Sequence, residues 1–287
     1  MKHTLIMLAA GVSSRMKKAL ATGSEDIDPK LLEEANTLPK CMLSVGVNGH
    51  RFIDYLVYNA YQAGFRDMIM ILHPNDMITE SHVRDTINGF CMHDLTLKIA
   101  RQYIAEGREK PFGTGDAVDQ ALTQCELADD EFFTLTNSDN LCSVEAFRKA
   151  YACEKNTILP YDPLSLGIAP EDRSRYGLIA SNPAGETVAL VEKPDATEIA
   201  QMESLGLRLS INMNLVTMRV GDVVTLVHNL VPHPVRDEKE ITDVYTSLFQ
   251  ANNLNCVVIE EPIPDLTSKA DIPRVQSYLR EAYPNIQ

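Results

Sequence analysis

A short loop of small residues near the start of the chain has the composition of an anion-binding turn. The run LAAGVSSRM at residues 8–16 places Gly11, Ser13 and Ser14 directly after an apolar segment, and Arg15 follows them. Where a strand passes through such a loop into a helix, backbone N–H groups point at an anion, and an arginine can grip phosphate oxygens in two places. An ordinary turn with a surface arginine would look similar. The loop has neither the Gly-Lys-Ser/Thr of a P-loop nor a Gly-x-Gly-x-x-Gly pattern, which removes the usual support for kinases and Rossmann dehydrogenases.

Three further segments carry residue types suited to a phosphate, a flat ligand or a metal, although each alone also has an ordinary structural explanation. Lys40 follows a proline, which stiffens the backbone and makes the lysine a positioned point charge. In PFGTGDAV (111–118) two glycines flank Thr114 and allow a flat ligand to approach the backbone, or Thr114 is simply a helix N-cap. The apolar run FFTLTNSDN (132–140) ends in Asp139. A carboxylate at the carboxyl end of a strand is well placed to hold Mg²⁺ beside substrate phosphates.

Short apolar runs alternate with helical patterns and must position these residues. The predicted strands are 4–9, 68–72, 95–99, 132–135, 157–159, 178–180, 188–191, 215–218 and 256–259, expected to be buried on both faces. The predicted helices are 52–63, ended by Gly64, and 79–89, 115–124, 144–154, 196–205, 221–230, 241–252 and 271–282. Alternating strands and helices in the first half indicate a parallel sheet covered on both faces.

The middle of the chain departs from this alternation. Residues 176–194 have the pattern of a hairpin that turns at 182–185, so an antiparallel element is inserted. We therefore predict an α/β fold: a single-domain, three-layer α/β/α, Rossmann-like arrangement with a mostly parallel mixed sheet and an antiparallel insertion. The domain covers 1–287, with a nucleotide-binding half to about residue 140 and an acceptor-binding half from about 141.

Charge and composition exclude several classes of protein. The chain has 26 Lys and Arg against 40 Asp and Glu, a net charge of −14, which argues against general nucleic-acid binding. The apolar run 5–10 is far shorter than the roughly 20 residues of a membrane span and lacks the form of a secretory signal, so no membrane is expected and the predicted location is cytoplasmic. The six cysteines form no C-x-x-C motif and are interpreted as reduced, small hydrophobic residues. The acidic segment 24–34 is interpreted as a solvated helical insertion.

Taken together and in order, these segments resemble the sugar-phosphate nucleotidyltransferases (NDP-sugar pyrophosphorylases). That family's pattern runs L-A-A-G-x-G-(S/T)-R, P-K-x-(L/M), G-T-x-x-A and a strand ending in Asp. The similarity continues through RYGL (175–178), VEKP (191–194), INMN (211–214), EITD (240–243) and PDLTSKADI (264–272). It spans roughly residues 4 to 275, and it implies the fold of the nucleotide-diphospho-sugar transferases.

The resemblance implies transfer of NMP from an NTP to a sugar 1-phosphate, with release of pyrophosphate and no covalent nucleophile. It assigns catalytic roles to Arg15, Lys40 and Lys193, and it implies Mg²⁺ as cofactor, held by Asp139 and Asp265. The nucleotide-binding residues that it implies are Leu8, Ala9, Ala10, Gly11, Ser13, Ser14, Gln102, Gly113 and Thr114. The acceptor-binding residues that it implies are Tyr176, Gly177, Glu192, Lys193 and Asn212. The partners are therefore an NTP and a phosphorylated small molecule, and a homo-oligomer is compatible with them.

Three departures from the family pattern concern the first loop and the acceptor. The run VSS (12–14) replaces a second glycine, as in small cytidylyl- and molybdopterin-type nucleotidyltransferases, and a longer segment separates Arg15 from Lys40. Asn214 stands where the family has Gly, and asparagine tolerates the positive φ that glycine allows. The run LTS (266–268) replaces x-G-T. Two alternatives stay open: a cytidylyltransferase acting on a non-sugar phosphate or phosphonate, and a non-catalytic regulator that binds nucleotide sugars.

Overall fold

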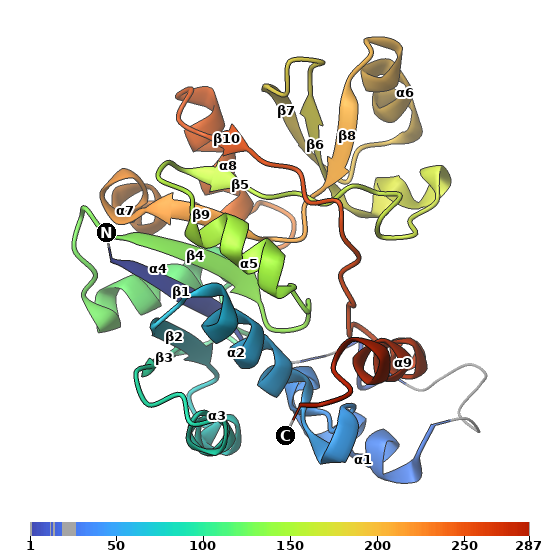
Figure 1. The fold of residues 1–287 in the computed structure, drawn as a ribbon. Helices are drawn as coiled ribbons and strands as arrows, with labels where there is room; N and C mark the ends of the chain where they lie inside the picture. Colours follow the sequence, from blue (N-terminus) through green and yellow to red (C-terminus); the bar gives the residue numbers. More distant parts are fainter. Residues whose placement is uncertain (1, 12, 14, 19–26, 287) are drawn as a thin grey trace.

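A seven-stranded sheet forms the centre of the molecule (Figure 1). The computed structural model describes residues 2–11, 13, 15–18 and 27–286. The strands of this sheet are β1 (His3–Leu8), β2 (Asp67–Leu72), β3 (Thr96–Arg101), β4 (Phe132–Asn137), β5 (Thr157–Ile158), β9 (Val216–Arg219) and β10 (Asn255–Cys256), in the order β10-β5-β9-β4-β1-β2-β3. Strand β9 runs antiparallel to β4 and β5, and the other pairs are parallel.

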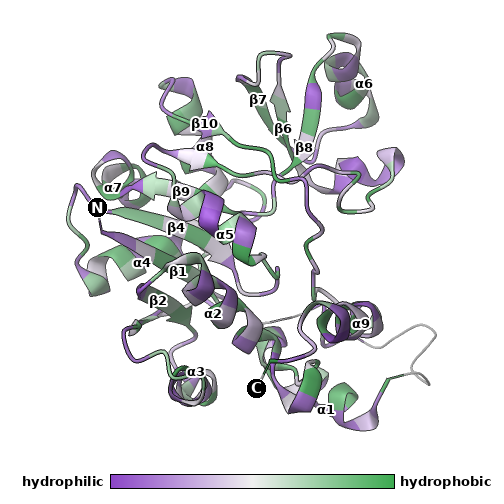
Figure 2. Ribbon diagram, viewed as in Figure 1, coloured by the Kyte–Doolittle hydropathy of each residue, from purple (hydrophilic) through white to green (hydrophobic). Residues whose placement is uncertain are grey.

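Helices cover both faces of this sheet and enclose two separate cores. Because side chains alternate along a strand, Leu5 and Met7 of β1 face one core while Ile6 faces the other. The first core packs against α2 (Phe52–Ala63), α5 (Val144–Tyr151) and α9 (Ile272–Ala282); the second packs against α4 (Thr114–Cys125), α7 (Val220–His228) and α8 (Ile241–Gln250). The central strands are mostly hydrophobic in Figure 2, whereas the helices carry both kinds of residue. The predicted three-layer α/β/α class is confirmed.

A second, antiparallel sheet lies beside the main one and confirms the predicted insertion. It has the order β7-β6-β8 and consists of β6 (Gly177–Ser181), β7 (Thr187–Glu192) and β8 (Arg208–Ile211), with α6 (Ala196–Ser204) packed on it. The hairpin turns at 182–185, where Gly185 N–H donates to the carbonyl of Asn182 at 2.9 Å. Strand β8 was not predicted, because four residues that include Arg and Ser carry little strand signal.

Several expected element boundaries and environments differ from the structure. Helix α4 begins at Thr114 with Gly113 as its N-cap, so the alternative in which Thr114 is the N-cap is wrong. Strands β5 and β10 are two residues long, shorter than predicted. Burial on both faces holds for β1, β2 and β4, but β3 and β7 are sheet edges with partly exposed side chains. Helix α3 (Met77–Gly89) starts two residues earlier than expected, with Asp76 as its N-cap.

The acidic segment 24–34 is not a solvated insertion in the part that the structure describes, which begins at residue 27. Helix α1 (Pro29–Thr37) buries Leu31 and Ala35 in the first core. Its Glu34 is only 9% exposed and accepts hydrogen bonds from the backbone N and the Oγ of Ser44, at 2.8 and 2.7 Å. A buried carboxylate that is hydrogen-bonded in this way fixes the helix. Helix α1 therefore anchors the segment that leads to Lys40.

Two composition-based predictions can be compared with the structure. All six cysteines are free thiols, and burial raises the pKa of Cys41 to about 12 and of Cys142 to about 11, so both stay protonated and pack as small apolar groups. Among the described residues, no helix combines the length and the hydropathy needed to cross a bilayer.

Candidate active site

A cleft of about 810 Å³ lies over the carboxyl ends of β1 and β4, between the main sheet and the antiparallel sheet. It brings together every predicted site residue that the structure describes; Ser14 lies outside the described residues. These residues are Leu8, Ala9, Ala10, Gly11, Ser13, Arg15, Lys40, Gln102, Gly113, Thr114, Asp139, Tyr176, Gly177, Glu192, Lys193, Asn212 and Asp265. They come from segments far apart in the sequence, and ligands of open α/β sheets bind at this edge.

The cleft also contains residues that the sequence analysis did not select. They are Lys110, Asn137, Arg175, Met213, Asn214, Arg236, Glu238, Glu240, Thr242 and Thr267, among others. Seven of these stand within the segments quoted for the family resemblance (Asn137, Arg175, Met213, Asn214, Glu240, Thr242 and Thr267), which is the signal that could have identified them. Six lysines and arginines line the cleft against five aspartates and glutamates, although the whole chain has a net charge of −14. Positive charge is therefore concentrated where an anionic ligand would bind.

The first loop is held in place by the lysine segment. Ser13 has a positive φ of 53°, and its Oγ accepts a hydrogen bond from the backbone N of Lys40 at 3.2 Å. Lys17 N–H donates to the carbonyl of Ser13, and Lys18 N–H donates to the carbonyl of Arg15 in a turn at 15–18. The side chain of Arg15 is exposed and lies along the cleft. The loop and Lys40 thus form one cationic corner.

Two carboxylates and one ammonium group meet at the floor of the cleft. The segments that carry Asp139 and Asp265 pair through backbone hydrogen bonds, with Leu266 N–H donating to the carbonyl of Asp139 at 2.9 Å. The Nζ of Lys40 forms an ion pair with the carboxylate of Asp139. Burial, and secondly the charge of Asp139, raise the pKa of Asp265 to about 6, although the hydroxyl of Thr267 donates to both of its oxygens, at 2.8 and 2.9 Å.

This donor set fits a magnesium ion that binds together with a phosphorylated substrate. Within the described residues, no three side chains among His, Cys, Asp and Glu form a cluster that could hold a metal by itself. Mg²⁺ is commonly held by one or two carboxylates, with substrate phosphates and water as its other ligands. Burial first, and the neighbouring charge of Asp139 second, raise the pKa of Asp265, and a cation bound beside it would favour its charged form.

Gln102 lies in the wall of the cleft that the end of β3 and the start of α4 form. It follows β3 and is 3% exposed, and its Nε2 donates to the carbonyl of Gly113 and to Oδ2 of Asp116, both at 2.9 Å. Both partners are acceptors, which fixes the orientation of the amide and leaves Oε1 as its free acceptor. The sequence could not show this pairing, because it depends on the contact between the end of β3 and the start of α4.

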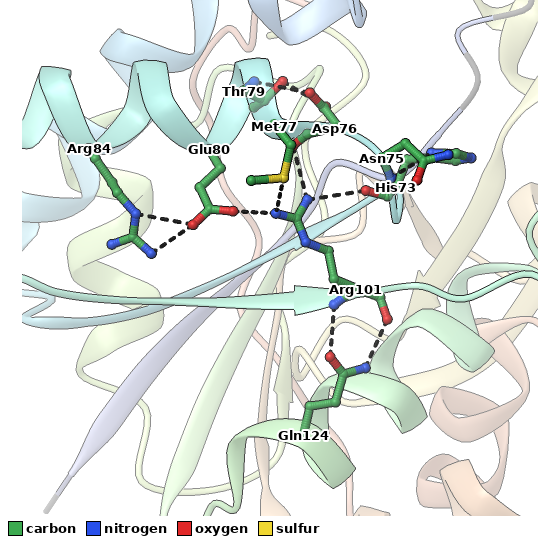
Figure 3. Close-up of polar contacts among 9 residues, drawn as sticks. All are labelled: His73, Asn75, Asp76, Met77, Thr79, Glu80, Arg84, Arg101 and Gln124. Atoms are coloured by element: carbon green, nitrogen blue, oxygen red, sulfur yellow. Dashed lines mark hydrogen bonds and ion pairs between the residues drawn. The ribbon is translucent and has the colours of Figure 1, made fainter.

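Side chains support the end of β3, which is an edge strand of the seven-stranded sheet (Figure 3). The backbone of Arg101 exchanges two hydrogen bonds with the amide of Gln124, at 2.9 and 2.8 Å, in place of a neighbouring strand. Its guanidinium donates to the carbonyl of Asp76 at 2.9 Å and forms an ion pair with Glu80. Satisfied edge groups keep a strand end rigid. Gln102 therefore projects from a well-supported position.

The antiparallel sheet builds another wall of the cleft, which the resemblance predicts to bind the acceptor. Lys193 has a φ of 49° and its backbone N–H donates to the carbonyl of Tyr176 at 3.2 Å. Its Nζ lies 4.0 Å from Oε1 of Glu192, and both side chains are largely exposed to the cleft. The backbone N–H of Asn212 donates to the carbonyl of Gly177 at 2.8 Å. Lys193 and Glu192 are therefore available to a ligand.

Asn214 keeps the backbone conformation that the family's glycine would allow. Its φ is 63°, as expected for an asparagine that replaces glycine. Its side chain adds what glycine lacks: Oδ1 accepts from the hydroxyl of Tyr245 at 2.6 Å, and Nδ2 donates to Oδ1 of Asn137 at 2.9 Å. Asn137 precedes Asp139 by two residues. The substitution thus ties the acceptor wall to the carboxylate floor.

A three-layer α/β/α fold with a charged cleft over the carboxyl ends of its parallel strands is typical of α/β proteins that bind ligands at this edge of the sheet. The family model described as "Nucleotidyl transferase" matches residues 31–263, most of the chain, and the chain therefore belongs to the nucleotidyl transferase family. This confirms the family to which the motifs point.

Individual relatives agree with this assignment at low sequence identity. The bifunctional protein GlmU of Hyphomonas neptunium is 24% identical over 284 residues, 98% of this chain and 52% of that protein. The glucose-1-phosphate adenylyltransferase of Trichlorobacter lovleyi is 22% identical over 164 residues, 56% of this chain and 40% of that protein. The chain thus spans about half or less of these relatives' lengths.

A solved structure shows the same fold. It is the crystal structure of a UDP-glucose pyrophosphorylase complexed with UDP-glucose, which aligns with a TM-score of 0.69 and 17% identity. The alignment covers 98% of this chain and 100% of that one.

Proposed function

We propose that this chain transfers NMP from an NTP to a phosphorylated small molecule, a sugar 1-phosphate, in a Mg²⁺-dependent reaction that releases pyrophosphate. The observation that carries the proposal is the convergence of Lys40, Asp139 and Asp265 in one cleft with the first loop. The family, and relatives whose names describe sugar nucleotide synthesis, support it.

The reaction needs no covalent intermediate on the protein. A phosphate oxygen of the acceptor forms a bond to the α-phosphorus of the NTP, the bond from that phosphorus to the β-phosphate bridging oxygen breaks, and pyrophosphate leaves with the electron pair. The reacting groups are all anionic, so the protein acts mainly by positioning and by neutralising charge. Arg15 and the backbone N–H groups of Gly11 and Ser13 bind the β- and γ-phosphates and stabilise the leaving group.

We assign the remaining roles from the family resemblance, and the position of these residues in the cleft supports them. Lys40 contacts the α-phosphate, or the incoming phosphate, from the cationic corner that it shares with the loop. Lys193 binds the acceptor phosphate and Glu192 accepts from an acceptor hydroxyl. Gln102 and the backbone at Gly113 contact the nucleobase. Asp139 and Asp265 would hold Mg²⁺, which would supply further neutralisation of phosphate charge.

A pyrophosphate-release panel tests the proposal. ATP, CTP, GTP, UTP and dTTP are each combined with sugar 1-phosphates and with amino-alcohol phosphates, in Mg²⁺ or in EDTA. Release that requires one NTP, one acceptor and Mg²⁺ supports the proposal, and turnover of an amino-alcohol phosphate with CTP supports the cytidylyltransferase instead. NTP binding without release for any pair overturns the catalytic proposal and favours the regulator.

A further inference from the structure

Two loops from opposite halves of the chain meet at the rim of the cleft. One loop, residues 102–113, joins β3 to α4 in the proposed nucleotide-binding half; the other, residues 229–240, joins α7 to α8 in the proposed acceptor-binding half. Lys110, Pro111 and Gly113 of the first loop line the cleft, as do Arg236, Glu238 and Glu240 of the second. A connection between these loops is thus a connection between the two proposed substrate sites.

The loops are joined by backbone hydrogen bonds at their inner ends. Lys239 N–H donates to the carbonyl of Phe112 at 2.8 Å, and Gly115 N–H donates to the carbonyl of Lys239 at 2.9 Å. The first residue of α8 continues the contact, because Ile241 N–H donates to Oγ1 of Thr114 at 3.1 Å. The two chain segments therefore lie side by side there and are joined by backbone hydrogen bonds, as paired strands are.

Arg108 and Asp237 join the outer ends of the two loops. Nη1 of Arg108 lies 2.7 Å from Oδ2 of Asp237, and Nη2 donates to the Asp237 backbone carbonyl at 2.6 Å. The guanidinium also lies over the ring of Phe112, 3.9 Å from its centroid. Arg108 therefore binds both the side chain and the backbone of the opposite loop while it packs on its own, which a simple surface ion pair does not do.

The second loop is shaped to present Asp237. Nδ1 of His233 accepts from the backbone N–H groups of Val235 and Arg236, at 3.2 and 3.3 Å. Asp237 N–H donates to the carbonyl of His233 at 2.8 Å, and Asp237 has a φ of 52°. A non-glycine residue persists in this conformation where its surroundings hold it. On the cleft side of the same turn, Arg236 pairs with Glu240 at 2.7 Å.

We infer that Arg108 and Asp237 are a positioning pair that couples the nucleotide side of the cleft to the acceptor side. Ordering of either loop by its ligand orders the other through this pair, so the two ligands bind with positive cooperativity. The kinetic part of this inference rests on the proposed function; the coupling between the loops does not.

Hydrogen exchange tests the coupling without any reaction. In Arg108→Ala we expect the backbone amides of both 103–112 and 232–240 to exchange about fivefold faster, which corresponds to the upper end of the stabilisation measured for exposed ion pairs. The exchange of amides in α2 should stay unchanged. Arg148→Ala is the matched control, because Arg148 forms an ion pair with Glu145 at the same 2.7 Å distance on α5, outside the cleft. Faster exchange in one loop only, or in neither, overturns the coupling.

Binding and kinetic measurements test the consequence of this coupling, which is positive cooperativity between the two ligands. The NTP that binds best in the panel is titrated into wild type, Arg108→Ala, Asp237→Asn and the double variant. We expect about fivefold weaker binding in Arg108→Ala, a double variant no weaker than that single variant, and partial recovery in Arg108→Lys. Additive losses contradict a shared role.

With an active acceptor, KM for both substrates should rise by about the same factor while kcat changes by less than about twofold. A fall in kcat at unchanged KM overturns the positioning role. If no acceptor is turned over, the proposed function fails, and the exchange and NTP-binding results still decide whether the pair couples the loops.

Discussion

Asp139 and Asp265 lie side by side because their backbones pair: Leu266 N–H donates to the Asp139 carbonyl, and Leu141 N–H donates to the carbonyl of Pro264, both at 2.9 Å. Of the two, Asp139 forms the ion pair with Lys40, whose charge also acts on Asp265. Burying two neighbouring carboxylates costs stability, and a bound cation would offset that cost. The arrangement is therefore informative about function.

Asp139→Asn should abolish turnover and leave the fold intact. The change removes one negative charge from the floor of the cleft but keeps its shape, so the loss reports on phosphate and metal binding. We expect kcat/KM to fall by at least about 10²-fold, by analogy with the loss of one preorganised electrostatic contact. Asp85→Asn, at an exposed position on α3, is the control. Activity near that of wild type would show that Asp139 holds no metal.

Asp265→Asn should remove activity and raise stability near neutral pH. Its pKa rises from 3.8 unfolded to about 6 folded, so the folded state binds the proton more tightly and the free energy of unfolding falls as pH rises from about 4 to about 6. We expect the variant to be more stable by about 1–2 kcal/mol at pH 7.5 in EDTA, with the difference vanishing at pH 4. Urea unfolding at both pH values measures this. An unchanged or lower stability at pH 7.5 contradicts the raised pKa of Asp265.

Lys40→Ala should lower kcat by about 10²–10³-fold, the effect of losing one charge-stabilising donor. The lysine also neutralises Asp139, so the variant should be less stable in EDTA and should regain stability when Mg²⁺ is added. Steady-state kinetics and thermal unfolding with and without Mg²⁺ measure both effects. An unchanged rate would make Lys40 a surface residue only.

Gly113→Ala should disrupt the junction between the nucleotide and acceptor loops. Gly113 has a φ of 100°, and an added Cβ would lie 2.9 Å from the backbone N of Lys239 and closer still to its carbonyl oxygen. The backbone conformation alone costs about 1–3 kcal/mol, and the clash adds to it. Gly107→Ala separates the two effects, because Gly107 also has a positive φ, 83°, but open space around its Cβ position. Equal losses of stability in the two variants would show that the close contact between residue 113 and the Lys239 backbone adds no cost.

Asn214→Gly and Asn214→Ala should rank in a fixed order of stability. Both leave the buried Tyr245 hydroxyl without its partner, which costs about 1–3 kcal/mol. Alanine adds the cost of a positive φ, about 1 kcal/mol, so it should be the less stable of the two. Chemical denaturation measures the order. If the glycine variant matches wild type, the bond to Tyr245 contributes nothing.

Local sequence determined the layers of this fold, since features within a few residues carry them. The apolar runs of β1, β2 and β4 and the turn at 182–185 define elements through short-range periodicity and turn chemistry. The family motifs marked the residues that line the cleft, and the left-handed backbone at Asn214 could be expected from the residue type. Their catalytic and binding roles, and the division into halves near residue 140, stay predictions.

Tertiary structure alone decided which of these residues act on one another. Glu34 looked like a solvated acid in an acidic run, yet it is buried against Ser44, because a charge pattern does not reveal what packs on it. The contacts of Asp139 with Asp265, and of Arg108 with Asp237, join segments more than a hundred residues apart. Such contacts depend on where the sheet places its strand ends and loops, and no local pattern encodes that distance.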